Sequence, residues 1–214
     1  MKKEKTMTSF RMRLRLTRAL VATATLWLSA GILATQADDH LDNPRVLMKT
    51  TDGEITIELF ADKSPITVEN FLSYVDAGHY DGTVFHRVIP NFMIQGGGFT
   101  AALEEKETGD PIVNESINKL HNTRGTLAMA RTSDPDSATA QFFINQRSNL
   151  RLDWAGGKDG YTVFGEVVDG MQVVDIIALS DTSSARALTT QGPTVFQDVP
   201  VKPVVIISVS RINP

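Results

Sequence analysis

Cysteine is absent from the 214-residue chain. Disulfide bonds, thiol catalysis and zinc–thiolate sites are therefore excluded, and the folded part must depend on its hydrophobic core. His40, His79 and His121 are far apart in the sequence and lack the spacing of metal ligands. We therefore expect no metal and no other cofactor.

Long hydrophobic runs are also scarce. Residues 19–33 form an uncharged, mostly apolar run of about 15 residues, whereas a membrane span needs roughly 20. Seven Lys and Arg residues precede this run, and the small residues of Ala34-Thr35-Gln36-Ala37 follow it. This layout predicts a secretory signal peptide at residues 1–37, which is removed, and a short connector at 38–43. An uncleaved membrane anchor is the alternative that the short length disfavours, so we expect no stable membrane insertion after cleavage.

Positive charge is in deficit once the predicted leader is removed. The leader holds seven of the 21 basic residues and one of the 25 acidic residues, which leaves 14 against 24, a net charge of −10. Nucleic-acid binding depends largely on basic contacts to phosphate, so we expect no nucleic-acid partner. The excess of acidic residues favours solubility instead.

The remaining sequence predicts many short strands and an early helix. Alternation of apolar and polar residues and turn signals place strands at 46–50, 54–60, 83–88, 92–97, 125–131, 140–145, 161–168 and 203–209. The first two read as a hairpin joined at Asp52-Gly53. Ser64 as N-cap and Pro65 at the first helical position predict a helix, which Gly78 ends. Its apolar stripe comprises Val68, Phe71, Leu72 and Val75.

A second amphipathic helix is predicted later in the chain. Asp169 is its expected N-cap, and Val173, Ile176 and Ile177 mark its apolar face. Segments 99–123, 148–160 and 181–200 read as loops. The pattern as a whole favours a mainly β fold, a closed barrel whose open ends are capped by the two helices.

The stretch from Phe85 to Gly97 carries the densest chemical signal. Strand alternation on either side of Pro90-Asn91 places Phe85, Arg87, Met93 and Gln95 on one small surface, an apolar pocket with two polar groups. The same alternation points His86 to the other face, where we expect a structural role.

Four segments of the chain resemble the cyclophilins, the peptidyl-prolyl cis-trans isomerases. They are 85–97, Gly125-Thr126-Leu127-Ala128-Met129-Ala130-Arg131, Ala140-Gln141-Phe142-Phe143-Ile144-Asn145 and 161–168, in the family's order and near its spacing. The sequence is most similar to the small periplasmic cyclophilins of Gram-negative bacteria. The resemblance implies an eight-stranded antiparallel barrel, an isomerase domain at 44–214, a periplasmic location and a monomer. It also implies a role in the folding of exported proteins, with proline-containing peptides and unfolded chains as substrates.

The family also implies roles for individual residues. Arg87 would be the catalytic cation, and Gln95 would bind the substrate backbone and help to hold Arg87. The proline ring would lie in a pocket lined by Phe92, Met93, Phe143 and Leu152. The groove near the residue before proline would be lined by Ala130, the main chain of Arg131 and Gln141, with Tyr161 as a further binding residue.

Two positions depart from the family's common pattern. Arg151 stands where many eukaryotic cyclophilins have a tryptophan that helps to bind cyclosporin, so we expect weak cyclosporin binding. Tyr161 stands where family members often have histidine, so a titrating imidazole cannot contribute there.

Other interpretations remain open at the level of sequence. The same groove could serve as a proline-binding module or chaperone with little turnover. A secreted barrel that carries a small ligand would need interior room, which the bulky β-branched and aromatic runs disfavour. Gly96-Gly97-Gly98 lacks the Lys and Ser/Thr of a phosphate-binding loop.

Overall fold

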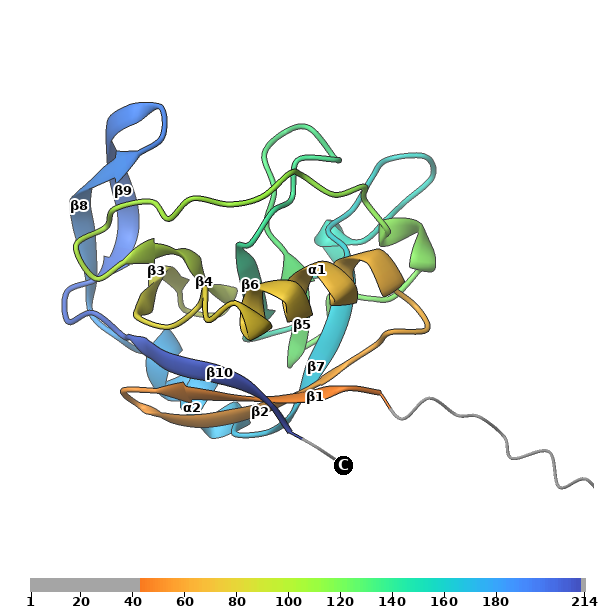
Figure 1. Ribbon diagram of the computed structural model, residues 1–214, viewed down its shortest axis with the longest axis horizontal. Coiled ribbons are helices and arrows are strands. Elements are labelled where there is room, and N and C mark those ends of the chain that lie inside the picture. Colours follow the sequence, from red (N-terminus) through yellow and green to blue (C-terminus); the bar gives the residue numbers. More distant parts are fainter. Residues whose placement is uncertain (1–42, 213–214) are drawn as a thin grey trace, which may run out of the picture. The chain divides into compact units, whose positions relative to one another are not determined.

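The computed structural model describes residues 43–212 (Figure 1). The predicted signal peptide at 1–37 and nearly all of the predicted connector lie outside the described residues. Among the described residues, no helix has the length and apolar character needed to cross a membrane.

Eight strands form one curled antiparallel sheet. Its strands are β1 (Arg45–Thr50), β2 (Gly53–Leu59), β3 (Thr83–Ile89), β4 (Met93–Thr100), β5 (Thr126–Met129), β6 (Phe142–Asn145), β7 (Val163–Asp169) and β10 (Ile206–Ile212). The strand order is β10-β1-β2-β7-β5-β6-β4-β3. The predicted strands are therefore all present, and the mainly β fold with two helices is confirmed.

The sheet does not close fully into a barrel. Its two edge strands, β3 and β10, are not paired along their length. The gap is bridged near one end, where Val84 pairs with Val205 and the Phe85 N–H donates to the Val204 carbonyl oxygen at 3.1 Å. A closed barrel was thus a slight overstatement, and the sheet is a curled half-barrel.

Helix α1 (Pro65–Asp76) follows the sequence prediction at both ends. Ser64 is the N-cap and Pro65 is the first helical residue. At the C-terminus Gly78 adopts φ +66° and donates to Val75, while His79 donates to Tyr74, the paired bonds of a Schellman motif. The predicted apolar stripe is buried along its whole length.

Helix α2 (Met171–Ala178) differs from its prediction in two details. Its N-cap is Gly170 at φ +89°, not Asp169, which is the last residue of β7 and accepts a bond from the Gly170 N–H. A side chain at position 170 would overlap the Glu54 carbonyl oxygen, so the backbone requires glycine there. Ile176 is 55% exposed, whereas Val173, Val174 and Ile177 face the core.

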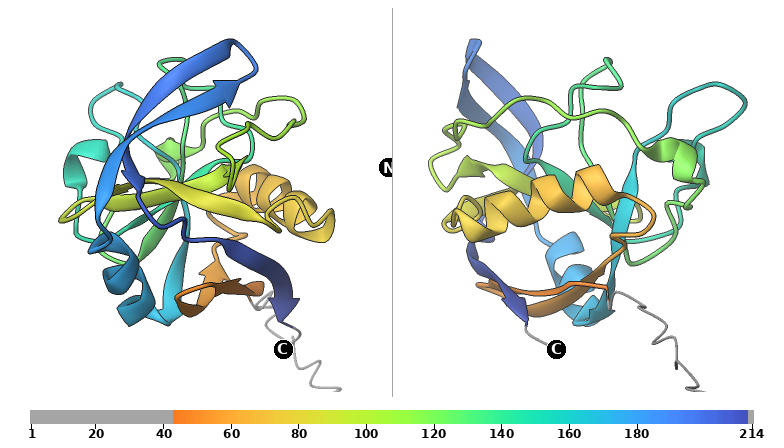
Figure 2. Two further views of the ribbon diagram at one scale, coloured as in Figure 1. Left: turned by 90° about the vertical axis from the view of Figure 1, so that its left-hand side faces the viewer. Right: turned by 45° about the vertical axis from the view of Figure 1, so that its right-hand side comes forward.

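The concave side of the sheet and both helices enclose one hydrophobic core (Figure 2). Aromatic rings fill its centre: Phe142 packs edge-on against Phe71 and Tyr80, with ring centroids 5.8 and 5.5 Å apart. Phe71, Tyr80, Phe142 and Phe164 are fully buried. A filled interior argues against the ligand-carrier interpretation, which requires room inside the barrel.

Residues 181–200 form a hairpin, so the prediction of a loop was wrong. Strands β8 (Thr182–Thr189) and β9 (Gly192–Pro200) pair with each other and project beside β3 and β4 (Figure 2). Most of their side chains are exposed, so the hairpin lacks the buried apolar face that makes a strand visible in a sequence.

Candidate active site

One row of paired residues crosses the outer face of the sheet. Arg87 on β3 pairs with Gln95 on β4, Gln95 with Phe143 on β6, Phe143 with Ala128 on β5, and Ala128 with Val163 on β7. Directly opposed residues of neighbouring strands project to the same face. The row therefore brings a cation and an amide into line with an apolar surface.

Residues two positions away along each strand extend this face, because side chains in a strand alternate with period two. Met93 precedes Gln95 on β4 in this way. Gln141 lies just before β6 and accepts a hydrogen bond from Gln95, and Ala130 and Tyr161, just outside β5 and β7, pack against the same apolar residues. The structure thus brings these predicted site residues onto one surface.

A β-bulge in β3 changes the expected position of two residues. The pairing with β4 advances by two residues on β3, from Phe85 to Arg87, while β4 moves only from Gly96 to Gln95. Phe85 consequently faces the core and packs edge-on against Phe142, rather than sharing the surface of Arg87. His86 is buried and borders the same cavity as Arg87, so its predicted placement on the opposite face was wrong.

An apolar cluster occupies the centre of the face. Its buried base comprises Met93, Ala128, Phe143 and Val163. Phe92, Ala130, Leu152 and Tyr161 are partly buried and pack around this base. The four residues predicted to line a proline pocket are therefore members of one hydrophobic cluster, distinct from the main core.

The polar end of the row is open to a ligand. The Gln95 amide Nε2 donates to Gln141 Oε1 at 3.1 Å. We expected Gln95 to help to hold Arg87, but its amide group pairs with Gln141 instead. Among the described residues, no hydrogen bond or ion pair engages the half-buried Arg87 guanidinium, which leaves its donors available.

Arg131 closes the opposite end of the face. Its guanidinium lies 4.7 Å from the centre of the Tyr161 ring and donates to the carbonyl oxygen of Asp159 at 2.9 Å. The neighbouring Ala130 is held by its own N–H, which donates to the Gln141 carbonyl oxygen at 3.0 Å. The backbone that was predicted to line the groove is thus fixed by hydrogen bonds.

A buried amide network, which the sequence interpretation missed, positions Phe92 and Leu152. The Asn149 Nδ2 donates to the Phe92 carbonyl oxygen at 2.9 Å and to Asn145 Oδ1 at 2.7 Å. The Leu152 N–H donates to the Asn149 carbonyl oxygen at 2.8 Å. These amides lie in segments that read as a strand end and a loop, so only their side-chain contacts in the fold identify their role.

Asp153 anchors the same loop from its other side. Its carboxylate accepts bonds from the Asn122 N–H at 2.7 Å and from His121 Nδ1 at 2.8 Å. Burial acts to raise the pKa of Asp153, but the bonds from Asn122 and His121 outweigh it and lower the pKa below its ordinary value. The ionised carboxylate is therefore part of the folded state.

Asp153→Asn should destabilise the protein by about 1–3 kcal/mol at pH 7, because an amide nitrogen would face the donors of Asn122. A carboxyl whose pKa is lowered by folding contributes stability above its ordinary value near 3.9, and this contribution is lost as the pH falls through the folded pKa. The gap between the variant and the parent should therefore narrow below about pH 4. Thermal unfolding from pH 7 to pH 3 measures this, with the exposed Asp159→Asn as the control. A gap that does not depend on pH would contradict the account.

Comparison with known proteins places this arrangement in a family. A family model described as cyclophilin type peptidyl-prolyl cis-trans isomerase/CLD matches residues 45–211. A peptidyl-prolyl cis-trans isomerase of Acinetobacter baylyi is 57% identical over 169 residues, which cover 79% of this chain and 86% of the relative. Isomerase A of Dickeya dadantii is 44% identical over 199 residues, which cover 93% of this chain and 98% of the relative. Isomerase B of Escherichia coli is 51% identical over 168 residues, with 77% and 98% covered.

A solved structure agrees in fold. The crystal structure of a Cryptosporidium parvum cyclophilin-type isomerase, determined in the presence of the dipeptide Ala-Pro, has a TM-score of 0.63 and 25% identity, and the match covers 79% of this chain and 99% of that one. The chain belongs to the cyclophilin-type peptidyl-prolyl cis-trans isomerases. It is an enzyme of that class, and its substrates are proline-containing peptides and proteins. Among the described residues, no group of three or more His, Asp or Glu side chains is arranged to hold a metal ion.

Proposed function

We propose that the outer face of the sheet binds a prolyl residue with its ring in the apolar pocket and that Arg87 stabilises the twisted peptide bond. The observation that carries the proposal is the cross-strand row. It sets the Arg87 guanidinium, which has no hydrogen bond or ion pair within residues 43–212, in line with Gln95 and the buried base at Phe143. Rotation about the bond before proline must break amide resonance, at a cost of about 18–20 kcal/mol. A site accelerates this step by binding the twisted bond more tightly than either planar form.

Arg87 has the chemistry that this step requires. Loss of resonance returns a lone pair to the prolyl nitrogen, which then becomes a hydrogen-bond acceptor. A guanidinium stays charged at all relevant pH values and presents fixed donors, so it suits this acceptor better than lysine does. No nucleophile, metal or cofactor takes part, since no covalent bond forms or breaks.

Gln95, Gln141 and Ala130 would hold the substrate backbone while the carbonyl before proline swings. The mutual bond between the two glutamine amides leaves each side chain with further donors or acceptors for a peptide. The backbone at Ala130 and Arg131 would form the wall beside the residue before proline. Tyr161, whose ring lies edge-on to Phe143 at 5.6 Å between centroids, would border the same wall.

We further propose that the enzyme acts on exported proteins in the periplasm, as a monomer, without a nucleic-acid partner. The signal-peptide pattern at residues 1–37 and the net charge of −10 in the remainder support this setting. Expression of the full-length chain in a Gram-negative host, followed by fractionation and N-terminal sequencing, tests it. We expect periplasmic protein that begins at Asp38, whereas uncleaved protein in the membrane fraction would contradict the proposal.

Cyclosporin should bind weakly. Arg151 occupies the position of the indole that aids binding in many eukaryotic relatives, and its guanidinium lies 4.7 Å from the centre of the Phe92 ring. This stacking covers the Phe92 edge of the pocket with a hydrated, charged group rather than an apolar ring. Titration with cyclosporin measures the affinity directly.

A further inference from the structure

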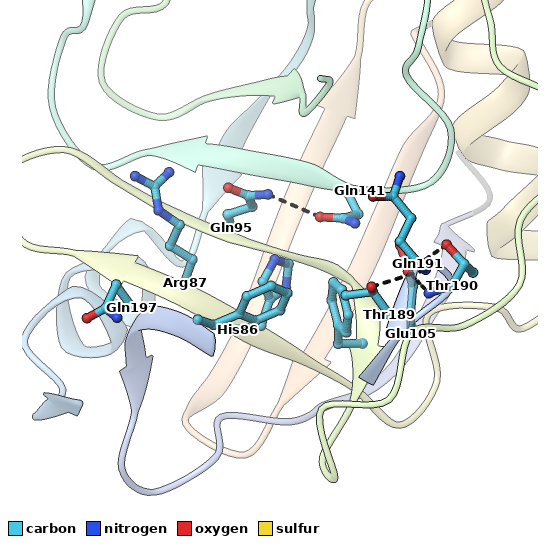
Figure 3. A pocket seen from close by; sticks show the side chains of 11 residues that line it. His86, Arg87, Gln95, Glu105, Gln141, Thr189, Thr190, Gln191 and Gln197 are labelled. Carbon is cyan, nitrogen blue, oxygen red and sulfur yellow. Dashed lines mark hydrogen bonds between the residues drawn. The ribbon is translucent and has the colours of Figure 1, made fainter. Parts of the chain in front are cut away.

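A pocket adjoins the polar end of the row. It is a cavity of about 360 Å³ whose lining includes Arg87 and Gln95 from the sheet and Thr190, Gln191 and Gln197 (Figure 3). The last three belong to the β8–β9 hairpin, which supplies a wall that the eight-stranded sheet alone would not provide.

The hairpin wall is anchored at two places. Midway along β9 the Phe196 ring packs against His86 and, edge-on, against Phe99, with centroids 5.7 and 4.9 Å apart. Near its tip the Thr190 N–H and hydroxyl donate to the Glu105 carboxylate at 2.8 and 3.2 Å (Figure 3). A pocket wall held in this way is preorganised, so a ligand does not have to order it.

The lining favours a neutral polar group. Four glutamine side chains border the cavity: Gln95, Gln141, Gln191 and Gln197. Its two charged residues have opposite sign, so an acidic ligand would meet Glu105 and a basic ligand would meet Arg87. Amide and hydroxyl groups can pair with the glutamine amides as donors and as acceptors.

His86 is a buried member of the pocket lining. The residue is only 4% exposed. Burial chiefly lowers the pKa of His86 to about 4, so the ring is neutral at pH 7. A neutral ring between aromatic neighbours again disfavours a charged occupant.

The distance between this pocket and the apolar cluster suits a single extended peptide. Gln95 borders the pocket, and Met93, two residues away on the same strand, lies in the apolar cluster. A strand rises about 3.3 Å per residue, so the two regions lie roughly 7 Å apart or more, about two residues of an extended substrate.

We propose that this pocket is a substrate subsite that binds a neutral polar side chain, namely Asn, Gln, Ser or Thr, about two or three residues from the isomerised proline. The proposal rests on the proposed use of the Arg87 face as the catalytic groove. The β8–β9 hairpin is then a specificity element of the enzyme.

The test uses alanine-rich peptides with one proline, in which Gln, Leu, Glu or Lys is placed at the second or third position before or after the proline. Isomerisation is measured for the parent protein, for the double variant Gln191→Ala/Gln197→Ala, and for the control Thr182→Ala/Thr194→Ala. The control changes exposed hairpin residues that do not border the pocket. At one position the parent should favour Gln over Leu, Glu and Lys by about three- to tenfold in kcat/KM, the value of one or two hydrogen bonds.

The preference should disappear in the double variant and persist in the control. Equal rates for all four side chains at every position in the parent would overturn the proposal, and so would a preference that survives in the double variant. Failure of the proposed groove itself gives a different result, because the all-alanine proline peptide would then keep its full rate in Arg87→Ala.

Discussion

Replacement of Arg87 by alanine should lower kcat/KM for prolyl isomerisation by about 100- to 1000-fold, the cost of removing a preorganised donor from a developing charge. The fold should be unaffected, because the guanidinium has no hydrogen bond or ion pair among the described residues. Peptide affinity should change little, since the apolar cluster at Met93 and Phe143 is retained. Steady-state kinetics together with a binding titration separates the two quantities.

Arg87→Lys is the matched control for this prediction. It keeps the positive charge but loses the planar fork of donors, so its activity should lie between those of the parent and the alanine variant. If the Arg87→Lys variant were as active as the parent, a positive charge at position 87 would be sufficient for catalysis. Full activity in Arg87→Ala would contradict the mechanism.

The second large effect is a difference between alanine variants of two neighbouring phenylalanines on β6, one affecting stability and the other activity. Phe142 faces the main core and Phe143 faces the outer apolar cluster, because successive side chains in a strand point to opposite faces. Phe142→Ala should destabilise the protein by about 3–5 kcal/mol through the cavity it leaves among Phe71 and Tyr80. At low temperature, where it remains folded, its kcat/KM should stay within about threefold of the parent.

Phe143→Ala should show the reverse pattern. Loss of the ring from the proline pocket should reduce kcat/KM by about tenfold or more, the equivalent of burying one large apolar side chain. Its destabilisation should be smaller than that of Phe142→Ala, because Phe143 packs in the smaller outer cluster. Chemical denaturation and kinetics on both variants measure this, and equal activity losses in the two would contradict the assignment of faces.

Much of this site could be predicted from sequence because strands impose a fixed alternation. Arg87, Met93 and Gln95 are two residues apart or directly paired, so an antiparallel hairpin was sufficient to bring them together. The failure at Phe85 and His86 has the same origin. One extra residue in β3 reverses which face of the sheet the following side chains point to. No residue type in the segment indicates that a bulge occurs there.

The β8–β9 hairpin was missed although a local signal exists for it. The sequence predicts the first turn from the pair Asp52-Gly53. The surrounding Thr50-Thr51-Asp52-Gly53 shares a Thr-Thr-Xaa-Gly pattern with Thr189-Thr190-Gln191-Gly192. In both turns the first threonine hydroxyl donates to the glycine carbonyl oxygen at 2.8 Å. The second turn is flanked by exposed strands that lack a regular alternation of apolar and polar residues. Without that alternation, the turn pattern alone does not predict a hairpin.

The amide network around Asn149 could not be predicted in the same way. It joins Asn122, Asn145 and Asp153, which come from separate segments and meet only when the segment before β5, the end of β6 and the 149–153 loop are packed together. Polar side chains in loops are typical of solvated turns, so the sequence pattern favoured the wrong environment for them. Only the fold shows that they position Phe92 and Leu152.

The most direct test of the account is one NMR experiment on the protein without residues 1–37, labelled at its methionine methyl groups and mixed with a short Xaa-Pro peptide. Exchange spectroscopy reports cis–trans interconversion of the peptide, while the Met93 methyl signal reports occupation of the apolar pocket. We predict rapid exchange whose dependence on peptide concentration matches the shift of the Met93 signal. Rapid exchange with an unchanged Met93 signal would move catalysis to another surface, and a shifted Met93 signal without exchange would make the groove a binding module; either result would contradict the account.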